Sequence, residues 1–377
     1  MFSRCRAHCR QDAGVPFGYL NLKAVFDYCK IKAGVNENQA NQNFSSAKIQ
    51  KPRIGITMGD PAGIGPEITL KALLNKNLNE ICQPVIIGDA EVLLRTARDL
   101  NLETDFPIVK KAEEIPQDSA QIIIFDLANI KEKIVLGEES AIAGKASAEY
   151  IETAVRLWKE KKIDAISTAP ISKKAISLGG YGFPGHTEFL AYLTDTKKFA
   201  MSFFAEKLRV VLLSTHVSLR KAIDLVKKES LVELIRFSNS ELEKLLKKNV
   251  KIAVAGLNPH ASEGGMFGTE EAEEIEPAIE ECRNKFGIDV SGAYSPDTIF
   301  LRGYRGEFDA VISCYHDQAT IAVKSLSFGA SVNVTLGLPL IRTSVDHGTA
   351  FDIAGRNLAD ESSMQAAIKL AADLVLG

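Results

Sequence analysis

Three histidines of the chain each stand a few residues after a short aliphatic run. A run of this kind that ends in polar residues is typical of a buried parallel strand with a site at its carboxyl end, where ligands bind in open α/β sheets. One such histidine is more often structural, but three imidazoles at three strand ends predict a divalent metal site. The runs and their histidines are 209–213 with His216, 252–255 with His260, and 309–313 with His316.

The elements that must position these histidines alternate between strands and helices along the chain. Besides the three runs, the aliphatic segments predict strands at 53–58, 84–88, 121–125, 164–169, 200–204 and 331–336. Helices are predicted at 90–100, 145–161, 230–248 and 362–376, three of them from an apolar stripe at helical spacing. This alternation predicts an α/β fold with a mainly parallel sheet.

Length and composition limit the class of protein. With 377 residues, 46% of them hydrophobic, the chain can bury a substantial core, and we expect two domains. Lysine and arginine number 45 against 48 acidic residues, so the net charge of −3 gives no sign of nucleic-acid binding. No apolar run approaches the roughly 20 residues of a membrane span, and the six cysteines have no framework spacing. We therefore expect a soluble cytoplasmic protein.

The first fifty residues differ in character from the rest of the chain. The start carries Arg4, Arg6 and Arg10 without an acidic residue, and segment 36–48 is polar with few apolar side chains. We predict a poorly ordered N-terminal extension at 1–50, outside the folded domains.

Three further segments each allow a structural and a functional interpretation. The glycine-rich turn 59–65 precedes a predicted helix and could hold an anion, although it lacks both the G-x-G-x-x-G spacing and a Walker lysine. The sequence 186–188 at a predicted helix start is either a cap or a substrate clamp. The acidic residues Glu270 and Glu271 are most simply partners of a helix dipole.

The segment 346–355, Asp-His-Gly-Thr-Ala-Phe-Asp-Ile-Ala-Gly, resembles the adenine-side cofactor loop of isopropylmalate and isocitrate dehydrogenases. The opening strand, turn and helix at 53–67 also resemble theirs. Those enzymes oxidise a secondary alcohol beta to a carboxylate and then decarboxylate the product. The metal set is different, because they use aspartates where this chain has histidines.

A narrower family matches the whole set of motifs from about residue 52 to the end. The chain resembles the 4-hydroxythreonine-4-phosphate dehydrogenases of pyridoxal phosphate biosynthesis. The blocks are Gly-Asp-Pro-Ala-Gly-Ile-Gly-Pro-Glu (59–67), Gly-His-Thr-Glu-Phe (185–189), Thr-His (215–216), Leu-Asn-Pro-His (257–260), Tyr-His-Asp-Gln (315–318), Val-Asn-Val-Thr-Leu-Gly-Leu-Pro (332–339) and Arg-Thr-Ser-Val-Asp-His-Gly-Thr-Ala (342–350).

The resemblance implies roles for individual residues. The metal ligands fall on His216, His260 and His316, with Zn²⁺ as the ion and Mg²⁺ or Co²⁺ as alternatives. The substrate contacts fall on His186, Thr187, Lys324, Asn333 and Arg342, and cofactor contacts on Gly348, Thr349, Asp352 and Gly355. The chain departs from the family at Ser262, at Phe267 and at Ala319-Thr320, where the family usually has glycine followed by an aliphatic residue. The last departure lies beside a metal ligand and concerns substrate identity.

The implied activity is NAD- or NADP-dependent oxidation of 4-phosphooxy-L-threonine to 2-amino-3-oxo-4-phosphooxybutanoate, which decarboxylates to 3-amino-2-oxopropyl phosphate. Relatives within the family act on 4-phospho-D-threonate or D-erythronate 4-phosphate, or on aromatic cis-diol carboxylates. A phosphate acetyltransferase-like enzyme and a non-enzymatic binding protein are the rival classes, but neither has a use for three histidines at strand ends. NAD against NADP stays open at this point.

The resemblance also implies two α/β/α domains with the active-site cleft between them. We expect a discontinuous first domain at 51–175 plus 337–377, and a second at 176–336 that carries the metal histidines and the dimer interface. In the implied homodimer, His316 reaches the site that holds the partner subunit's His216 and the partner subunit's His260.

Overall fold

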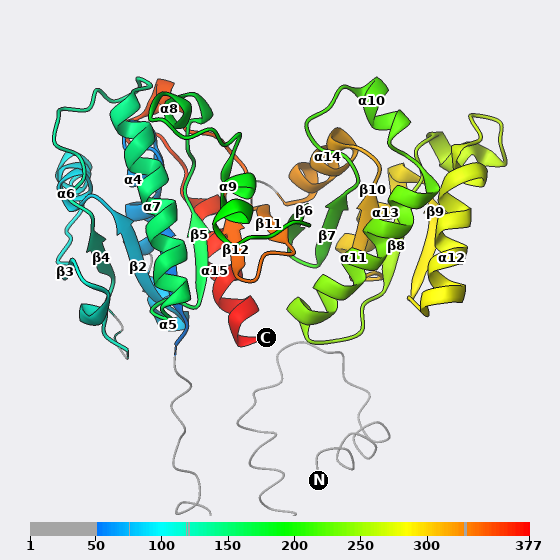
Figure 1. The fold of residues 1–377 in the computed structure, drawn as a ribbon, viewed down its shortest axis with the longest axis horizontal. Helices are drawn as coiled ribbons and strands as arrows, with labels where there is room; N and C mark the ends of the chain where they lie inside the picture. Colours follow the sequence, from blue (N-terminus) through cyan, green and yellow to red (C-terminus); the bar gives the residue numbers. More distant parts are fainter. Residues whose placement is uncertain (1–50, 75, 118, 120, 328–329) are drawn as a thin grey trace, which may run out of the picture. The chain divides into compact units, whose positions relative to one another are not determined.

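The nine predicted aliphatic runs all form strands of one twelve-stranded sheet, whose three further strands, at 108–109, 290–294 and 341–344, were not predicted (Figure 1). The structure is a computed structural model, and it describes residues 51–377 except residues 75, 118, 120, 328 and 329. The strands are β1 (Arg53–Thr57), β2 (Gln83–Gly88), β3 (Ile108–Val109), β4 (Ile123–Asp126), β5 (Ala165–Thr168), β6 (Ala200–Ala205), β7 (Leu208–Leu212), β8 (Ile252–Ala255), β9 (Val290–Tyr294), β10 (Ala310–Ser313), β11 (Val332–Leu336) and β12 (Ile341–Ser344).

The sheet is mainly parallel, as the sequence predicted. Its strand order is β3-β4-β2-β1-β5-β12-β11-β6-β7-β10-β8-β9. Only the central pairs β12–β11, β11–β6 and β6–β7 are antiparallel. The three histidine-bearing runs are β7, β10 and β8, which lie next to one another in this order and run parallel. Their carboxyl ends therefore meet at one edge of the sheet.

Helices connect the strands, and some of them begin at a capping side chain. Ser140 accepts a hydrogen bond from the backbone N–H of Ala143, so α7 begins at Ala141, four residues before the predicted start. The helical elements are α4 (Gly65–Leu74), α5 (Lys76–Ile81), α6 (Ala90–Asp99), η1 (Ala112–Glu114), α7 (Ala141–Lys159), α8 (Lys173–Leu178), α9 (His186–Leu193), α10 (Leu219–Asp224), α11 (Lys228–Leu246), η2 (Pro259–Glu263), η3 (Glu271–Ile275), α12 (Glu276–Phe286), α13 (Pro296–Tyr304), α14 (His316–Ser327), η4 (Phe351–Ile353) and α15 (Ser362–Leu376).

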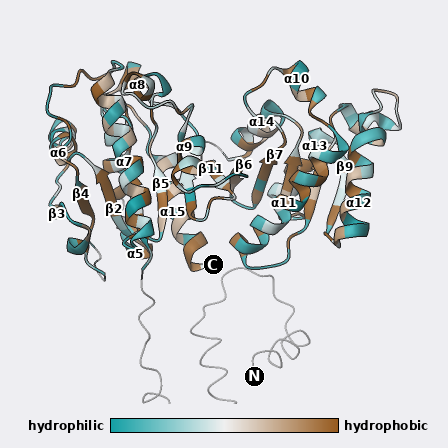
Figure 2. Ribbon diagram, viewed as in Figure 1, coloured by the Kyte–Doolittle hydropathy of each residue, from teal (hydrophilic) through white to brown (hydrophobic). Residues whose placement is uncertain are grey.

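The strands next to the histidines are buried on both faces. In β8, Ile252 and Val254 belong to a core with α11 and α12, whereas Ala253 and Ala255 belong to a second core with α13 and α14. Alternate residues of a strand point to opposite faces, so helices cover both sides, which is why the sequence shows unbroken aliphatic runs. In Figure 2 the strands are mostly brown, the colour of hydrophobic residues, and the outer surfaces of the helices are mostly teal, the colour of hydrophilic ones. A third, larger core packs around β1, β2 and β5.

The glycine-rich turn after β1 is a structural element and not an exposed anion site. All of its residues, 59–65, are buried. Its backbone donors are already used: Ala62 N donates to Asp60 Oδ1 at 2.9 Å and Ile64 N donates to Thr349 O at 3.0 Å. Asp60 is fully buried, and burial raises the pKa of its carboxyl to about 6. The turn therefore serves to fasten segment 346–355 to the first helix.

Residues 51–377 form one compact unit, through which a single sheet runs, and the division into 51–175 plus 337–377 and 176–336 stays a prediction. The predicted extension 1–50 lies outside the described residues. Within the described part of the chain, no helix is long and apolar enough to span a membrane. The cysteines described there, Cys82, Cys282 and Cys314, are buried thiols without disulfides.

Candidate active site

A cleft of about 710 Å³ collects most of the residues that the sequence singled out. It is lined by segments that follow β5 and β12 and by segments that follow β7 and β10. The predicted site residues that line it are His186, Thr187, His216, His316, Lys324, Asn333, Arg342 and Gly348. The predicted site residues His260, Thr349, Asp352 and Gly355 are not part of its lining.

Arg342 on β12 lies at the bottom of the cleft with 3% of its surface exposed. Its guanidinium donates to Asn333 Oδ1 at 3.1 Å, to Thr335 Oγ1 at 3.2 Å and to Thr168 Oγ1 at 2.8 Å, all neutral acceptors. Its Nε has no partner, and no carboxylate among the described residues forms an ion pair with it. Burial lowers the pKa of Arg342 to about 9, so the side chain is still a cation at neutral pH. A buried cation with a free donor is an incomplete anion site.

His186 stands beside this cation as the first residue of α9. Burial, assisted by the charge of Arg342, holds the pKa of His186 well below its usual value, so the ring is neutral. Its Nε2 is buried without a partner. We call Arg342, His186 and Asn333 the floor of the cleft. The floor offers two unpartnered buried nitrogen atoms, which suits a ligand with anionic or hydroxyl oxygens.

Two lysines extend the positive charge along the cleft wall. Lys324, predicted from the sequence, is exposed on α14, and its Nζ donates to Asp346 O at 3.5 Å. Lys173 at the start of α8 also lines the cleft and is exposed. Sequence reasoning missed Lys173, although it stands five residues after β5 ends at Thr168. With Arg342, these lysines can neutralise a ligand that carries more than one negative charge.

His216 and His316 form a pair at the strand ends of β7 and β10, which we call the histidine rim. Their ring centroids are 5.6 Å apart within one chain. Asp317 Oδ1 lies 2.7 Å from Nδ1 of His316, which leaves Nε2 of that ring for a ligand. Partial burial lowers the pKa of His216, with smaller contributions from Lys173 and His316. Sequence reasoning missed Asp317, which directly follows the predicted ligand.

The third predicted metal ligand, His260, does not lie with the other two. It is exposed beyond β8, and its ring centroid is 6.3 Å from that of Phe267. The residues from His260 to Gly265 all have positive φ angles, between 44° and 96°. Non-glycine residues in this conformation cost about 1 kcal/mol or more each. Within the described part of the chain, no three His, Cys, Asp or Glu side chains are grouped to hold a metal.

The two histidines of the rim are joined by buried side chains behind them. Ser214 Oγ donates to Cys314 O at 3.0 Å, which ties the segment before His216 to the segment before His316. Gln318 accepts from Cys314 N at 2.8 Å and donates to Gly256 O at 2.7 Å. The same glutamine thus connects the rim to the base of the segment that carries His260.

The segment predicted to contact the cofactor borders the same cleft. Gly348 lines the cleft, whereas Thr349 packs on the turn after β1, where a Cβ on Gly63 would lie 2.9 Å from Thr349 O. Asp352 is exposed on η4, and Gly355 has a φ of 73°. The loop therefore has a fixed base and an exposed outer part, which is compatible with a cofactor lying along it.

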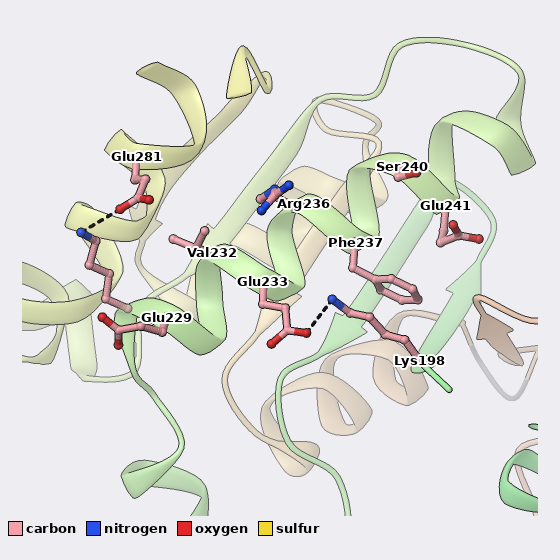
Figure 3. A pocket seen from close by; sticks show the side chains of 10 residues that line it. Lys198, Glu229, Val232, Glu233, Arg236, Phe237, Ser240, Glu241 and Glu281 are labelled. Atoms are coloured by element: carbon pink, nitrogen blue, oxygen red, sulfur yellow. Dashed lines mark ion pairs between the residues drawn. The ribbon is translucent and has the colours of Figure 1, made fainter. Parts of the chain in front are cut away.

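Two other cavities hold no comparable set of groups. One of about 620 Å³ runs along α11 and is shown in Figure 3. Four of its charged side chains form two ion pairs, Lys198–Glu233 at 2.7 Å and Lys228–Glu281 at 2.8 Å. Another of about 780 Å³ lies near Gly337 and the end of α15 and contains no histidine.

Comparisons with known proteins identify the family of the chain. Residues 80–371 match the family model described as pyridoxal phosphate biosynthetic protein PdxA. A D-threonate 4-phosphate dehydrogenase of Cupriavidus necator is 45% identical over 324 residues, 86% of this chain and 97% of the relative. A protein of Oceanobacillus iheyensis, provisionally given the same name, is 46% identical over 327 residues, covering 86% of this chain and 98% of that protein. A crystal structure of a 4-hydroxythreonine-4-phosphate dehydrogenase from Burkholderia phymatum is 43% identical, with a TM-score of 0.75 over 86% of this chain and 98% of that one.

Proposed function

The chain belongs to the PdxA family of pyridoxal phosphate biosynthetic proteins, a dehydrogenase family, and we propose that it oxidises the secondary alcohol of a small hydroxy acid phosphorylated at O4. We propose further that the reaction uses NAD or NADP and a divalent metal, and that the 3-oxo acid formed loses carbon dioxide.

One observation carries this proposal: the floor and the histidine rim line the same cleft. The floor is a buried cation with unpartnered donors, which suits a phosphate or carboxylate group. The rim is a pair of imidazoles 5.6 Å apart, which suits a divalent ion. A rival acyltransferase or a passive binding protein would have no use for the rim.

In this proposal, different residues of the cleft bind the substrate and orient it. Arg342 and His186 hold one anionic end of the substrate, and Lys324 and Lys173 neutralise the other. Asn333 and Thr335 fix the guanidinium plane, so the substrate is held in one orientation. Asp317 holds His316 with Nε2 free to bind a metal.

A metal ion held by His216 and His316 would supply Lewis acidity that lowers the pKa of the substrate alcohol and stabilises the charge left by loss of carbon dioxide. A nicotinamide cofactor bound along Gly348, Thr349, Asp352 and Gly355 would supply the hydride acceptor. Both assignments remain part of the proposal.

We propose that a second copy of the chain completes the metal site with His260. Two imidazoles leave a metal site short of ligands, and His260 is exposed on a segment whose tip carries Met266 and Phe267, 72% and 45% exposed. The rim in turn is flanked by exposed Val217 and Ile321. Apolar surfaces of this kind beside both parts of the site favour contact between two copies. The family resemblance had implied instead that His316 of one chain joins the partner subunit's His216 and the partner subunit's His260.

Two substrates are the candidates to test. D-threonate 4-phosphate comes first, because relatives at 45–46% identity carry that name and because Thr320, where the family usually has an aliphatic residue, lines the cleft. 4-Phosphooxy-L-threonine, predicted from the sequence, is the second. They differ at C2, which carries a hydroxyl in the first and an amino group in the second.

The test is an assay of the purified protein with Zn²⁺, Mg²⁺ or Co²⁺ and with NAD or NADP. We expect reduced nicotinamide to form with one phosphorylated acid and far more slowly with unphosphorylated D-threonate, the matched control. If neither phosphorylated acid reduces either cofactor with any of these metals, the proposed activity is wrong.

A further inference from the structure

The segment that carries His260 is held in a conformation that its own residues do not favour. Four consecutive residues other than glycine, from His260 to Glu263, have positive φ angles between 44° and 63°. L-residues visit this region singly and rarely in runs. The segment is exposed over most of its length, so packing of its own side chains does not explain the conformation. Gly265 N and Phe267 N donate to Ser262 O inside the segment, both at 3.1 Å, and further contacts are made at its base.

Glu271 provides these contacts from thirteen and fourteen residues further along the chain. It is 1% exposed, and its Oε1 accepts from the backbone N–H groups of Leu257 and Asn258, both at 2.8 Å. Its Oε2 accepts from Asn258 Nδ2 at 2.9 Å. Hydrogen bonds to an ionised acceptor are stronger than neutral ones, and three of them converge on one carboxylate.

Two glycines near this carboxylate, Gly256 and Gly268, have little room for a side chain. A Cβ on Gly256 would lie 3.1 Å from Glu271 Oε1, and a Cβ on Gly268 would lie 2.6 Å from Asn258 Nδ2. Asn258 Nδ2 also donates to Glu270 Oε2 at 2.7 Å. Gly256 and Gly268, at the two ends of the segment, thus both pack against the hydrogen-bonded pair Glu271 and Asn258. An acid that merely offsets a helix dipole would not need this enclosure.

We propose that Glu271 is the positioning residue of His260: its buried carboxylate locks the turn at Leu257 and Asn258 and so fixes where the imidazole projects. The inference rests on the proposed metal role of His260 and adds to it a second residue, which acts through the backbone. Residues that orient a metal ligand typically change metal affinity by about 10- to 100-fold when they are replaced.

The experiment measures Zn²⁺ affinity of the intact protein by competition with a chromogenic chelator. Glu271→Ala is compared with Glu273→Ala, which removes an exposed carboxylate two residues away and is the matched control. We expect affinity to fall at least about tenfold in Glu271→Ala and to stay at the wild-type level in Glu273→Ala. Glu271→Gln keeps an oxygen for the two backbone donors, so it should recover part of the loss.

A second measurement separates positioning from general destabilisation. Amide hydrogen exchange in the metal-free protein should speed up at Leu257 and Asn258 in Glu271→Ala and stay unchanged in the strands of the sheet. If Glu271→Ala does not fold, Glu271→Gln and Asn258→Ala, which removes one of the three hydrogen bonds, should each weaken Zn²⁺ binding in its place.

The outcomes distinguish this inference from the proposed function. If His260→Ala lowers Zn²⁺ affinity but folded Glu271→Ala binds Zn²⁺ like Glu273→Ala, the positioning role is wrong and the metal site stands. If His260→Ala itself binds Zn²⁺ as the wild type does, the metal role of His260 is wrong, and the role of Glu271 falls with it.

Discussion

The floor and the histidine rim of the cleft are built in different ways. The floor residues Arg342 and Asn333 sit on the adjacent strands β12 and β11, and sheet register fixes their positions. The rim residues stand in connections beyond β7 and β10, and they supply two of the three predicted ligands. Under the proposed function, one chain therefore supplies the buried cation for an anionic group but only two of the three metal ligands.

This difference indicates which steps one chain can perform alone. In the proposed function, binding of the anionic substrate depends on Arg342 and Asn333 of the sheet and on His186, Lys173 and Lys324 of the flanking helices. In the proposed function, oxidation depends on the rim together with a metal and His260. Substitutions at the floor should therefore weaken substrate binding, whereas substitutions at the rim should lower turnover and leave binding unchanged.

The largest effect is expected for His316→Ala. Loss of a metal ligand should remove Lewis-acid assistance worth several kcal/mol, so turnover should fall roughly 10³-fold or more. Binding of the phosphorylated acid to the metal-free protein, measured by calorimetry, should stay close to the wild-type value. A variant that loses substrate binding and turnover together would show that floor and rim are not independent.

The next largest effect concerns Asp60, a buried acid that does not line the cleft and whose pKa is raised mainly by burial. Its folded-state pKa of about 6 lies above the value of 3.8 for a free side chain. The stability that Asp60 contributes is therefore present below about pH 4 and is lost as the pH rises through 6, by up to about 3 kcal/mol.

The free energy of unfolding of the wild type and of Asp60→Asn, measured by urea denaturation from pH 4 to 7.5, tests this expectation. The wild type should lose stability relative to the variant as the pH rises, while kcat/KM at pH 7.5 stays similar. A constant difference between the two across this range would contradict the raised pKa.

A smaller effect is expected for Arg342→Ala. Removing the charge-assisted contact to the substrate should cost on the order of 2 kcal/mol, roughly thirtyfold in kcat/KM on the phosphorylated acid. Inorganic phosphate should raise the Tm of the metal-free wild type, because it compensates the buried cation, and should raise that of the variant much less. Lys324→Ala is the control for exposed charge, and its loss should be smaller. Equal losses in both variants would place the phosphate nearer the wall of the cleft than the floor.

Much of the fold could be predicted from the sequence because burial on both faces leaves unbroken aliphatic runs, as in β8 and β10. Strand β9, Val-Ser-Gly-Ala-Tyr at the sheet edge, was not predicted, since it is mostly half-buried and lacks such a run. The strand-end histidines were found by the same signal. The separate position of His260 was not, because it depends on a left-handed backbone held by Glu271, and neither periodicity nor spacing encodes that contact.

The last and smallest expected effect tests how the rim is completed. If His216 and His316 act in one chain and a second chain supplies His260, then His316→Ala and His260→Ala should complement each other. Random exchange of the two variants makes about half of the dimers mixed, and each mixed dimer has one doubly altered and one intact site. About a quarter of wild-type activity should return. A mixture of His216→Ala with His316→Ala should stay inactive, because every site keeps a lesion in its own pair. Exchange is verified with differently tagged subunits. Recovery in the second mixture would mean that the two histidines of the rim serve different sites, despite the 5.6 Å between their rings.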